Sequence, residues 1–161
     1  MTAALELRPE VDIRIADDRH HNAILSSWLT SYKNDNPPQL VGVRSQIYYD
    51  EHEQTIHDLI GGKKAQKKRS ASIVLVAADP EDQKHIFSWL CAEILPRELV
   101  VHYVFTYEPF RSPDFKLAST LLGKLLEERG SRKLIATHRT NAVRDKLERL
   151  GFTFNPYRFN P

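Results

Sequence analysis

The sequence predicts an α/β (α+β) fold, a mixed and mostly antiparallel central sheet with helices on both faces. Three apolar segments, 73–78, 86–95 and 99–107, follow one another with only short polar turns between them, which is typical of an antiparallel meander. From Phe115 onward apolar residues recur every three or four positions, which predicts a helix. Later strands alternate with helices and can therefore pair in parallel through right-handed crossovers. The predicted order of elements is β-α-α-β-β-β-α-β-α-β.

Size and composition limit the class of protein. A chain of 161 residues is expected to form one domain, here 1–161 with 1–10 as an irregular lead-in. The 23 basic and 21 acidic residues nearly balance, so net charge alone does not indicate a nucleic-acid partner. The single cysteine excludes an internal disulfide and a multi-cysteine zinc site. No apolar run is long enough to span a membrane, and the first residues do not resemble a signal peptide, so we expect a cytoplasmic protein.

The first third of the chain is predicted to form one strand and two helices. Apolar and polar residues alternate over 11–15, which indicates a short strand. Asp17 or Asp18 can then cap a helix that runs to about Lys33, before a break that contains two prolines. A second helix is expected over 45–60, where two glycines stop it.

A strongly basic segment separates these helices from the first long strand. It carries five positive charges within seven residues: Lys63, Lys64, Lys67, Lys68 and Arg69. Charge runs of this kind are usually solvated loops. The alternative is a contact with the phosphates of a nucleic acid, which would make the protein a nucleic-acid-directed modifying enzyme.

The last third is predicted to alternate between helices and strands. The helix over 115–130 follows a strand through a tight turn, which points its free N–H groups at the turn and favours an anion there. A strand is expected over 133–137, a helix over 140–150, and one or two last strands over 152–159. The apolar face of the second of these helices consists of Val143, Leu147 and Leu150.

Three local features resemble the GNAT (Gcn5-related N-acetyltransferase) superfamily, and the resemblance extends over about 11–159. The aromatic–Arg pair at 110–111, between a strand and a helix, is similar to the superfamily's motif A. The segment 86–95 is similar to the strand that comes before motif A. The sequence from Asn141 to the string RLGF at 149–152 is similar to the superfamily's closing motif. The strings HYVF and EPFR are also similar to those of phage-borne members.

This resemblance implies an acyl-CoA-dependent N-acyltransferase that moves an acetyl group from acetyl-CoA to an amine on a small molecule, a protein or a modified nucleobase. It implies that the pantetheine arm lies along Val104, Phe105 and Thr106. It implies that the pyrophosphate lies at the loop that contains Arg111, Ser112, Asp114, Phe115 and Lys116. It also implies that Asn141 and Arg144 face the CoA arm from the next helix.

The predicted phosphate loop departs from the superfamily pattern. Asp114 and Lys116 stand where glycines let the backbone approach phosphates closely, and Pro113 lacks an N–H donor. Arg111 and Lys116 can compensate by direct charge pairing. Leu147 replaces the tyrosine that commonly protonates the leaving thiolate, so transfer relies on another acid or on solvent, or does not occur. The alternative to an enzyme is therefore a GNAT-like fold with lost or altered catalysis that acts as a binding module.

Three residues on the central strands are candidates for the general base. Glu108 ends the strand of motif A and is either a base near the acyl group or a turn residue. His102 belongs to a residue type that titrates near neutrality, but a lone histidine in a strand is more often a packed core residue. Glu93 would be costly to bury unpaired, so it faces solvent or lines a cleft. Tyr103 or Tyr107 could replace the missing acid.

Other reactive residues carry less weight. Cys91 could form a covalent intermediate, but buried cysteines are usually inert. The pairs His20-His21 and His52/His57 lack the i, i+4 spacing of a helical metal site, so we expect no metal. The expected partners are a CoA thioester and an amine acceptor, without a membrane, and the protein is expected to be a monomer or a homodimer.

Overall fold

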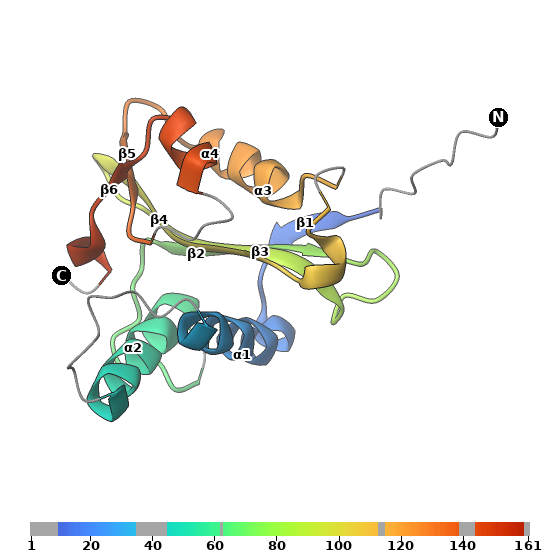
Figure 1. Cartoon of the computed structure of the whole chain (residues 1–161), viewed down its shortest axis with the longest axis horizontal. Helices are drawn as coiled ribbons and strands as arrows, with labels where there is room; N and C mark the ends of the chain where they lie inside the picture. The colour runs from blue at the N-terminus through green and yellow to red at the C-terminus, as the bar shows by residue number, and fades with distance from the viewer. Residues whose placement is uncertain (1–9, 35–44, 62, 113–114, 139–143, 160–161) are drawn as a thin grey trace.

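The computed structural model describes residues 10–34, 45–61, 63–112, 115–138 and 144–159. These residues form one six-stranded sheet with the strand order β1-β2-β3-β4-β5-β6 (Figure 1). The strands are β1 (Asp12–Ile15), β2 (Ser72–Ala78), β3 (Ile86–Ile94), β4 (Glu98–Thr106), β5 (Lys133–Ala136) and β6 (Thr153–Phe154).

The sheet is mixed, as the sequence predicts. β1 pairs with β2, β2 with β3 and β3 with β4 in antiparallel orientation. β4 and β5 pair in parallel, and so do β5 and β6. Short turns join β2, β3 and β4, whereas a helix separates each parallel pair. The predicted fold class and element order are thereby confirmed.

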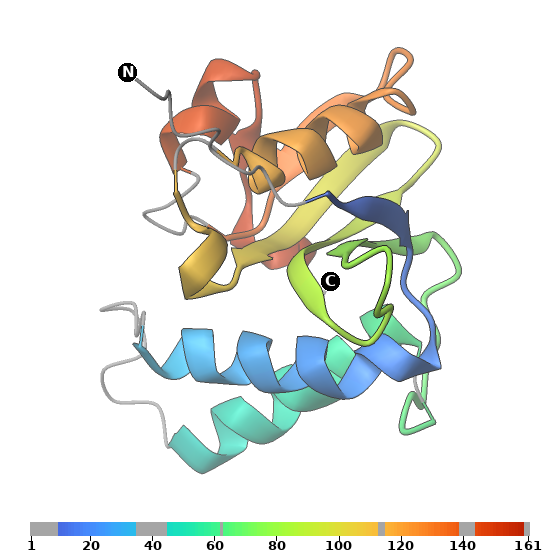
Figure 2. The ribbon, with the colours of Figure 1, turned by 90° about the vertical axis from the view of Figure 1, so that its right-hand side faces the viewer.

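Helices cover both faces of the sheet. α1 (Asp18–Asn34) and α2 (Ser45–Ile60) lie on one face, and α3 (Leu117–Leu126) and α4 (Arg144–Arg149) lie on the other (Figure 1, Figure 2). Asp17 caps α1, because its carboxylate accepts a hydrogen bond of 3.0 Å from the backbone N–H of Arg19. Among the described helices, none has the length and apolar character needed to cross a lipid bilayer.

One core, here called the α3 layer, fills the space between the sheet and α3. Leu121, Leu122 and Leu125 of α3 are at most 1% exposed and pack in one cluster with Leu90 and Leu99 of the sheet. Each such leucine contributes about 2–5 kcal/mol relative to alanine. This packing fixes the position of α3 relative to the end of β4.

The opposite core, here called the α1 layer, is aromatic. Trp28 of α1 and Trp89 of β3 are both fully buried. The Trp28 ring centroid lies 5.2 Å from those of Trp89 and Tyr103, and 6.0 Å from that of Phe159. The indole N–H of Trp89 donates to the hydroxyl of Ser27 over 2.9 Å. This layer therefore ties the C-terminal end of the chain to α1.

A β-bulge in β4 changes the direction of its side chains. Cys91 of β3 stands opposite Tyr103, and the next residue, Ala92, stands opposite Val101, so His102 is an extra residue in β4. Before the bulge Val101 packs in the α3 layer, and after it Tyr103 packs in the α1 layer. Bulges of this kind commonly redirect side chains beside functional sites.

The predicted last strand is present but short, and one residue predicted for the apolar face of the last helix is wrong. The segment 152–159 forms only the two-residue strand β6 and then a 3₁₀ turn, η3 (Pro156–Arg158), because proline cannot donate to a strand ladder. Leu150 is 37% exposed rather than part of an apolar face. It follows the last residue of α4, and Gly151 with φ of 92° turns the chain away. Val143 lies outside the described residues.

Candidate active site

The two central parallel strands separate at a defined point. The pairing of β4 with β5 ends at Val101 and Ala136, followed by one further hydrogen bond of 3.0 Å from the Thr137 N–H to the Val101 carbonyl. β4 itself continues to Thr106. The part of β4 that runs past β5 contains three predicted cofactor residues, Val104, Phe105 and Thr106.

The first turn of α3 faces the same end of the sheet. The helix begins at Leu117, two residues later than predicted, because Lys116 adopts φ of 48° and ψ of 37° as its N-cap. This is the left-handed conformation that favours glycine. The glycine position of the resemblance is therefore occupied here by a lysine with glycine-like backbone geometry.

A second lysine, which sequence reasoning missed, lies at this turn. The Lys146 ammonium of α4 donates to the hydroxyl of Ser119 in α3. Burial lowers the pKa of Lys146, and the charges of Arg149 and Lys116 lower it further. Two lysines, Lys116 and Lys146, thus lie at the start of α3. Lys146 immediately precedes Leu147, the position that the resemblance had already singled out, which was the available signal.

Arg111, predicted to contact the pyrophosphate, folds back over the end of β4. Its Nε donates a 2.7 Å hydrogen bond to the carbonyl of Thr106. Its guanidinium carbon lies 5.3 Å from the ring centroid of Phe105, within the range of a cation–π contact. Ser112 and Phe115 flank the loop and are partly buried. Asp114 lies outside the described residues.

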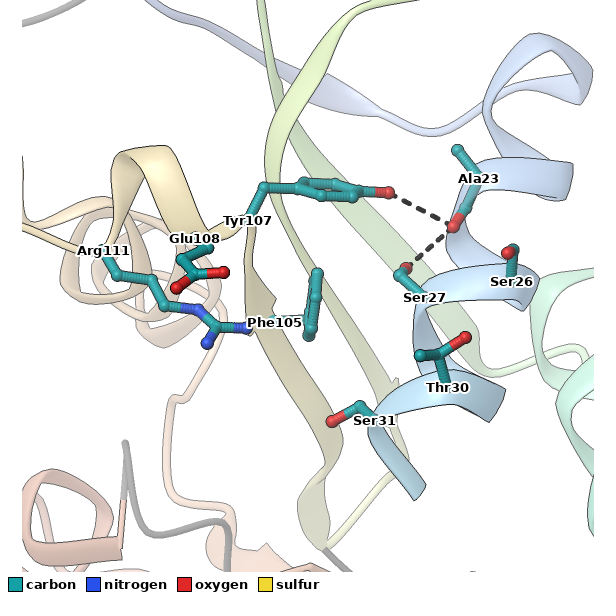
Figure 3. Close-up of a pocket in the computed structure, with 9 residues that line it drawn as sticks. All are labelled: Ala23, Ser26, Ser27, Thr30, Ser31, Phe105, Tyr107, Glu108 and Arg111. Atoms are coloured by element: carbon teal, nitrogen blue, oxygen red, sulfur yellow. Dashed lines mark hydrogen bonds between the residues drawn. The ribbon is translucent and has the colours of Figure 1, made fainter. Parts of the chain in front are cut away.

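A pocket of about 500 Å³ opens between α1 and the end of β4 (Figure 3). It is lined by Ala23, Ser26, Ser27, Thr30, Ser31, Phe105, Tyr107, Glu108 and Arg111. The Tyr107 hydroxyl donates to the Ala23 carbonyl over 3.2 Å, and the Ser27 hydroxyl donates to the same carbonyl over 2.7 Å. These bonds hold one wall in place. The pocket brings together hydroxyl groups, aromatic rings, one carboxylate and one guanidinium.

The other predicted base candidates lie apart from Glu108, in a buried cluster. The Nε2 of His102 is 2.7 Å from the Oε1 of Glu93, and the Arg69 guanidinium donates to that same oxygen. Glu93 is 5% exposed, so of the two predicted alternatives the one in which it faces solvent is wrong. A buried carboxylate requires partners, and the bulge at His102 supplies one of them.

This cluster also changes the interpretation of the basic segment. Arg69 turns inward, where it donates to Glu93 and to the Phe159 carbonyl, so it is not part of the exposed charge run. The lysines of the segment, Lys63, Lys64, Lys67 and Lys68, are exposed. The Asp58 carboxylate holds the segment by accepting from the N–H groups of Gln66 and Lys67. A nucleic-acid contact through these lysines stays a prediction.

The charges in the cluster follow from its contacts. Burial alone would raise the pKa of Glu93, but the hydrogen bonds and charges of His102 and Arg69 together lower it. Burial, together with the charge of Arg69, lowers the pKa of His102, although the hydrogen bond and charge of Glu93 act in the opposite direction. Near neutral pH the cluster therefore contains an ionised Glu93, a cationic Arg69 and a neutral His102.

Two residues that sequence reasoning missed extend this cluster to the strand gap. The Thr137 Oγ1 lies 3.1 Å from the Nδ1 of His102 and 2.8 Å from the Nδ1 of His138. The same His138 nitrogen is 2.6 Å from the His102 carbonyl oxygen. The only sequence signal was a Thr-His pair at the end of a predicted strand. The remaining catalytic candidate, Tyr103, makes an edge-to-face contact with His138, with the ring centroids 5.5 Å apart.

The remaining predicted residues do not join either group. Arg144 begins α4 and is exposed, and Asn141 lies outside the described residues. Burial raises the pKa of the Cys91 thiol far above its usual range, with a further contribution from Glu93, which does not support a covalent thiolate. Within the residues that the structure describes, no three His, Cys, Asp or Glu side chains are arranged to hold a metal ion.

Comparisons with known proteins identify the fold. The sequence matches no protein-family model, and a search of curated protein sequences finds no match. A Pyrococcus furiosus protein assigned as an acetyl transferase superposes with a TM-score of 0.63 at 17% identity, over 89% of this chain and 93% of that one. A Trypanosoma brucei acetyltransferase gives 0.53 at 19% identity, over the same shares. A ribosomal-protein-alanine N-acetyltransferase from Brucella melitensis biovar Abortus gives 0.50 at 16% identity, over 91% and 94%. The chain therefore has the fold of the GNAT superfamily.

Proposed function

We propose that the protein is an acyl-CoA-dependent N-acetyltransferase that moves an acetyl group from acetyl-CoA to an amine. The observation that carries this proposal is the separation of β4 from β5 beyond Val101 and Ala136, beside a helix whose N-cap is Lys116 and whose first turn contacts Lys146. In this fold, whose solved relatives include acetyltransferases, such a gap suits an extended thioester arm. The acetyl group would then reach the α1 side of the sheet.

The donor half of the site is assigned to β4 and α3. The backbone of Val104 to Thr106 offers hydrogen-bonding groups on the side from which β5 has departed. The phosphates would lie near Lys116 and Lys146, where the first N–H groups of α3 also favour an anion. The charges of these lysine side chains would thus replace part of the phosphate binding that the backbone at glycines provides in other loops. Asn141 and Arg144 remain predicted contacts of the CoA arm.

The acceptor half is assigned to the pocket between α1 and β4. The Glu108 carboxylate would attract an ammonium group, and the hydroxyls of Ser26, Thr30 and Ser31 would bind polar substituents. The rings of Phe105 and Tyr107 would cover the apolar part of the substrate. A polar, hydroxyl-bearing amine fits this lining better than a purely apolar one.

Thermal unfolding with acetyl-CoA tests the donor site. A ligand at about 100 times its Kd stabilises the native state by roughly 2.7 kcal/mol, so the melting temperature should rise measurably. No rise at millimolar acetyl-CoA would exclude the enzyme proposal. Replacing Lys146 by Gln should reduce the shift, whereas Lys133→Gln, an exposed lysine at the start of β5, should leave it unchanged. Arg111→Ala in the same assay tests whether Arg111 contacts the pyrophosphate, as the resemblance implies.

Filling the pocket tests the acceptor site separately. Thr30 is exposed on α1 and lines the pocket, so Thr30→Trp should raise the KM for the amine and leave the acetyl-CoA shift intact. Asn22→Trp, at an exposed α1 position outside the pocket lining, is the matched control. If the protein bound acetyl-CoA but released no free thiol with any amine tested, the alternative would hold, a binding module with lost catalysis.

A further inference from the structure

We propose that the acceptor is an aminocarboxylic acid, whose ammonium group is bound by Glu108 and whose carboxylate is bound by Arg111. This inference rests on the proposed function. It names the class of amine for the pocket between α1 and β4, which includes free amino acids and short peptides. It also assigns the Arg111 guanidinium to the acceptor rather than to the phosphates of CoA.

Both charges come from one short turn at the end of β4. The 3₁₀ turn η2 (Glu108–Phe110) follows the strand, and Arg111 is its C-cap residue. Side chains three residues apart lie above one another in 3₁₀ geometry, and both Glu108 and Arg111 line the pocket. Figure 3 shows the two charged groups on the η2 side of the pocket, opposite the side chains of α1.

Arg111 is held so that it does not neutralise Glu108. Its Nε donates to the Thr106 carbonyl over 2.7 Å, and its guanidinium carbon lies 5.3 Å from the Phe105 ring centroid. Within the described residues, the Glu108 carboxylate and the two terminal nitrogens of Arg111 make no hydrogen bond or ion pair. Two opposite charges therefore line the same pocket, and each is available to a ligand.

The backbone that carries the two charges is fixed by its own contacts. Pro109 restricts the φ angle inside the turn. The ring of Phe110 packs on that of Phe87 with centroids 4.3 Å apart. The Arg111 N–H donates to the Glu108 carbonyl over 3.1 Å. A ligand would thus meet a preorganised turn, which lowers the cost of ordering on binding.

The charges of the pocket match a zwitterion. Among the described residues that line it, Glu108 and Arg111 are the two that are charged at neutral pH. The guanidinium N–H groups suit a carboxylate, and the carboxylate of Glu108 suits an ammonium group. A second ammonium group, as in a diamine, would meet the guanidinium instead, which disfavours it. One carboxylate balances one guanidinium, whereas a phosphate dianion would leave a negative charge uncompensated.

The α1 wall adds a preference for a polar side chain. The Ser27 hydroxyl is occupied, because it donates to the Ala23 carbonyl and accepts from the indole of Trp89. Ser26 and Thr30 also line the pocket and are exposed. Their hydroxyls can each donate and accept a hydrogen bond, so they would bind a polar substituent of the acid.

Acetylation would change how this acceptor fits the pocket. The nitrogen forms a C–N bond with the acetyl carbonyl carbon, and the C–S bond breaks with its electron pair on sulfur. Of the two protons that the ammonium group loses, one ends on the thiol and one is released to solvent. The product keeps its carboxylate but has no cation for Glu108. N-acetylserine should therefore bind more weakly than serine, which favours product release.

Ligand-observed NMR titration of the full-length protein in the presence of CoA measures the preference directly. The probes are L-serine, L-glutamine and the dipeptide glycyl-serine, each compared with its own C-terminal carboxamide. At least one acid should bind about tenfold more tightly than its carboxamide, as for one hydrogen bond to a charged group. Preference for a single amino acid or for the dipeptide distinguishes the two sources of this chemistry. Equal binding of acid and carboxamide in every pair would overturn the inference.

Variants assign the preference to the two charges. Arg111→Met should remove the preference for the acid while the carboxamide still binds, and Arg111→Lys should keep part of it. Arg97→Met is the matched control, because this arginine is exposed and lies outside the pocket lining. Glu108→Gln should weaken acid and carboxamide alike, because both carry the ammonium group. Equal weakening of acid and carboxamide by Arg111→Met would overturn the role of its charge.

The acetyl-CoA thermal shift separates this inference from the proposed function. Arg111→Met should keep the shift of the wild type, and a smaller shift would overturn the inference by placing Arg111 at the phosphates. No shift in the wild type would overturn the proposed function, whatever the acids do. Release of free thiol with the carboxamides but not with the acids would overturn the inference alone.

Discussion

Arg69 is the residue on which the buried charge of the molecule depends. It reaches from the end of the basic segment to Glu93 of β3, and it also donates to the Phe159 carbonyl. Its side chain is only 20% exposed. One residue thus joins a surface loop, a central strand and the C-terminal segment, and its removal would leave a carboxylate without its cation.

Arg69→Met should therefore destabilise the protein by about 3–5 kcal/mol, the usual cost of breaking a buried ion pair on one side. Urea unfolding at pH 7 measures the change. Lys68→Met is the matched control, because this neighbouring lysine is exposed, and its effect should stay within about 0.5 kcal/mol. Equal effects of the two variants would contradict the ion pair.

The same pair predicts a dependence on pH. The pKa of Glu93 lies below its ordinary value of 4.5 in the folded protein, so its stabilisation is present above that pH and is lost as the pH falls. The difference in unfolding free energy between wild type and Arg69→Met should therefore shrink from pH 7 to pH 3. A constant difference across this range would mean that Glu93 is not the group concerned.

Lys116 offers a test of backbone strain. At φ of 48° a non-glycine residue costs roughly 1–2 kcal/mol. Lys116→Gly should therefore stabilise the protein, raising the melting temperature by about 2–4 °C per kcal/mol gained. Lys124→Gly, an exposed substitution inside α3, should instead destabilise it by about 1 kcal/mol. If Lys116→Gly did not stabilise the protein, the loop would accommodate lysine at this position without strain.

At the scale of elements, the C-terminal turn contributes more than its length suggests. η3 follows a strand of only two residues, yet Phe159 after it is 4% exposed and lies in the α1 layer. Its ring is close to those of Trp28, His52, His102 and His138. The segment therefore closes the α1 layer beside His102 and His138.

Phe159→Ala should destabilise the protein by about 3–5 kcal/mol, as for other buried phenylalanines. The control lies two residues earlier, because Tyr157 is 83% exposed, and Tyr157→Ala should change the unfolding free energy by no more than about 0.5 kcal/mol. Chemical denaturation of both variants gives the comparison. A small effect at Phe159 would mean that the C-terminal segment packs only loosely.

Local patterns predict most elements but not the buried cluster of Glu93, His102 and Arg69. α2 and β2 agree with their predicted ranges to within a residue, because apolar periodicity and flanking glycines mark them. The last strand, predicted within 152–159, is present but only two residues long, because a proline follows it at position 156. Glu93, His102 and Arg69 come together from separate segments, so their spacing in the sequence does not predict that they are in contact. The bulge in β4 also prevents the sequence from showing which face of the sheet each side chain of β4 lies on, because a prediction from alternation assumes an unbroken register.

For the molecule as a whole, both cores share one sheet, which predicts a single cooperative unit over 1–161. Trp28 and Trp89 both lie in the α1 layer, so tryptophan fluorescence reports that layer, whereas far-UV circular dichroism reports all helices. The two signals should follow one coincident urea transition, as expected of a two-state domain. Separate midpoints would show that the layers unfold independently and that the single-domain prediction is wrong.

The bulge in β4 makes the site sensitive to the length of the chain rather than to its composition. Odd-numbered residues of β4 pack in the α3 layer up to Val101 and in the α1 layer from Tyr103 onward. A single-residue deletion here would reverse that assignment for the rest of the strand. Phe105 and Tyr107 would leave the pocket wall for the opposite core. Substitutions in β4 can therefore adjust this region. An insertion or deletion in β4 would instead disrupt both the gap between β4 and β5 and the pocket between α1 and β4.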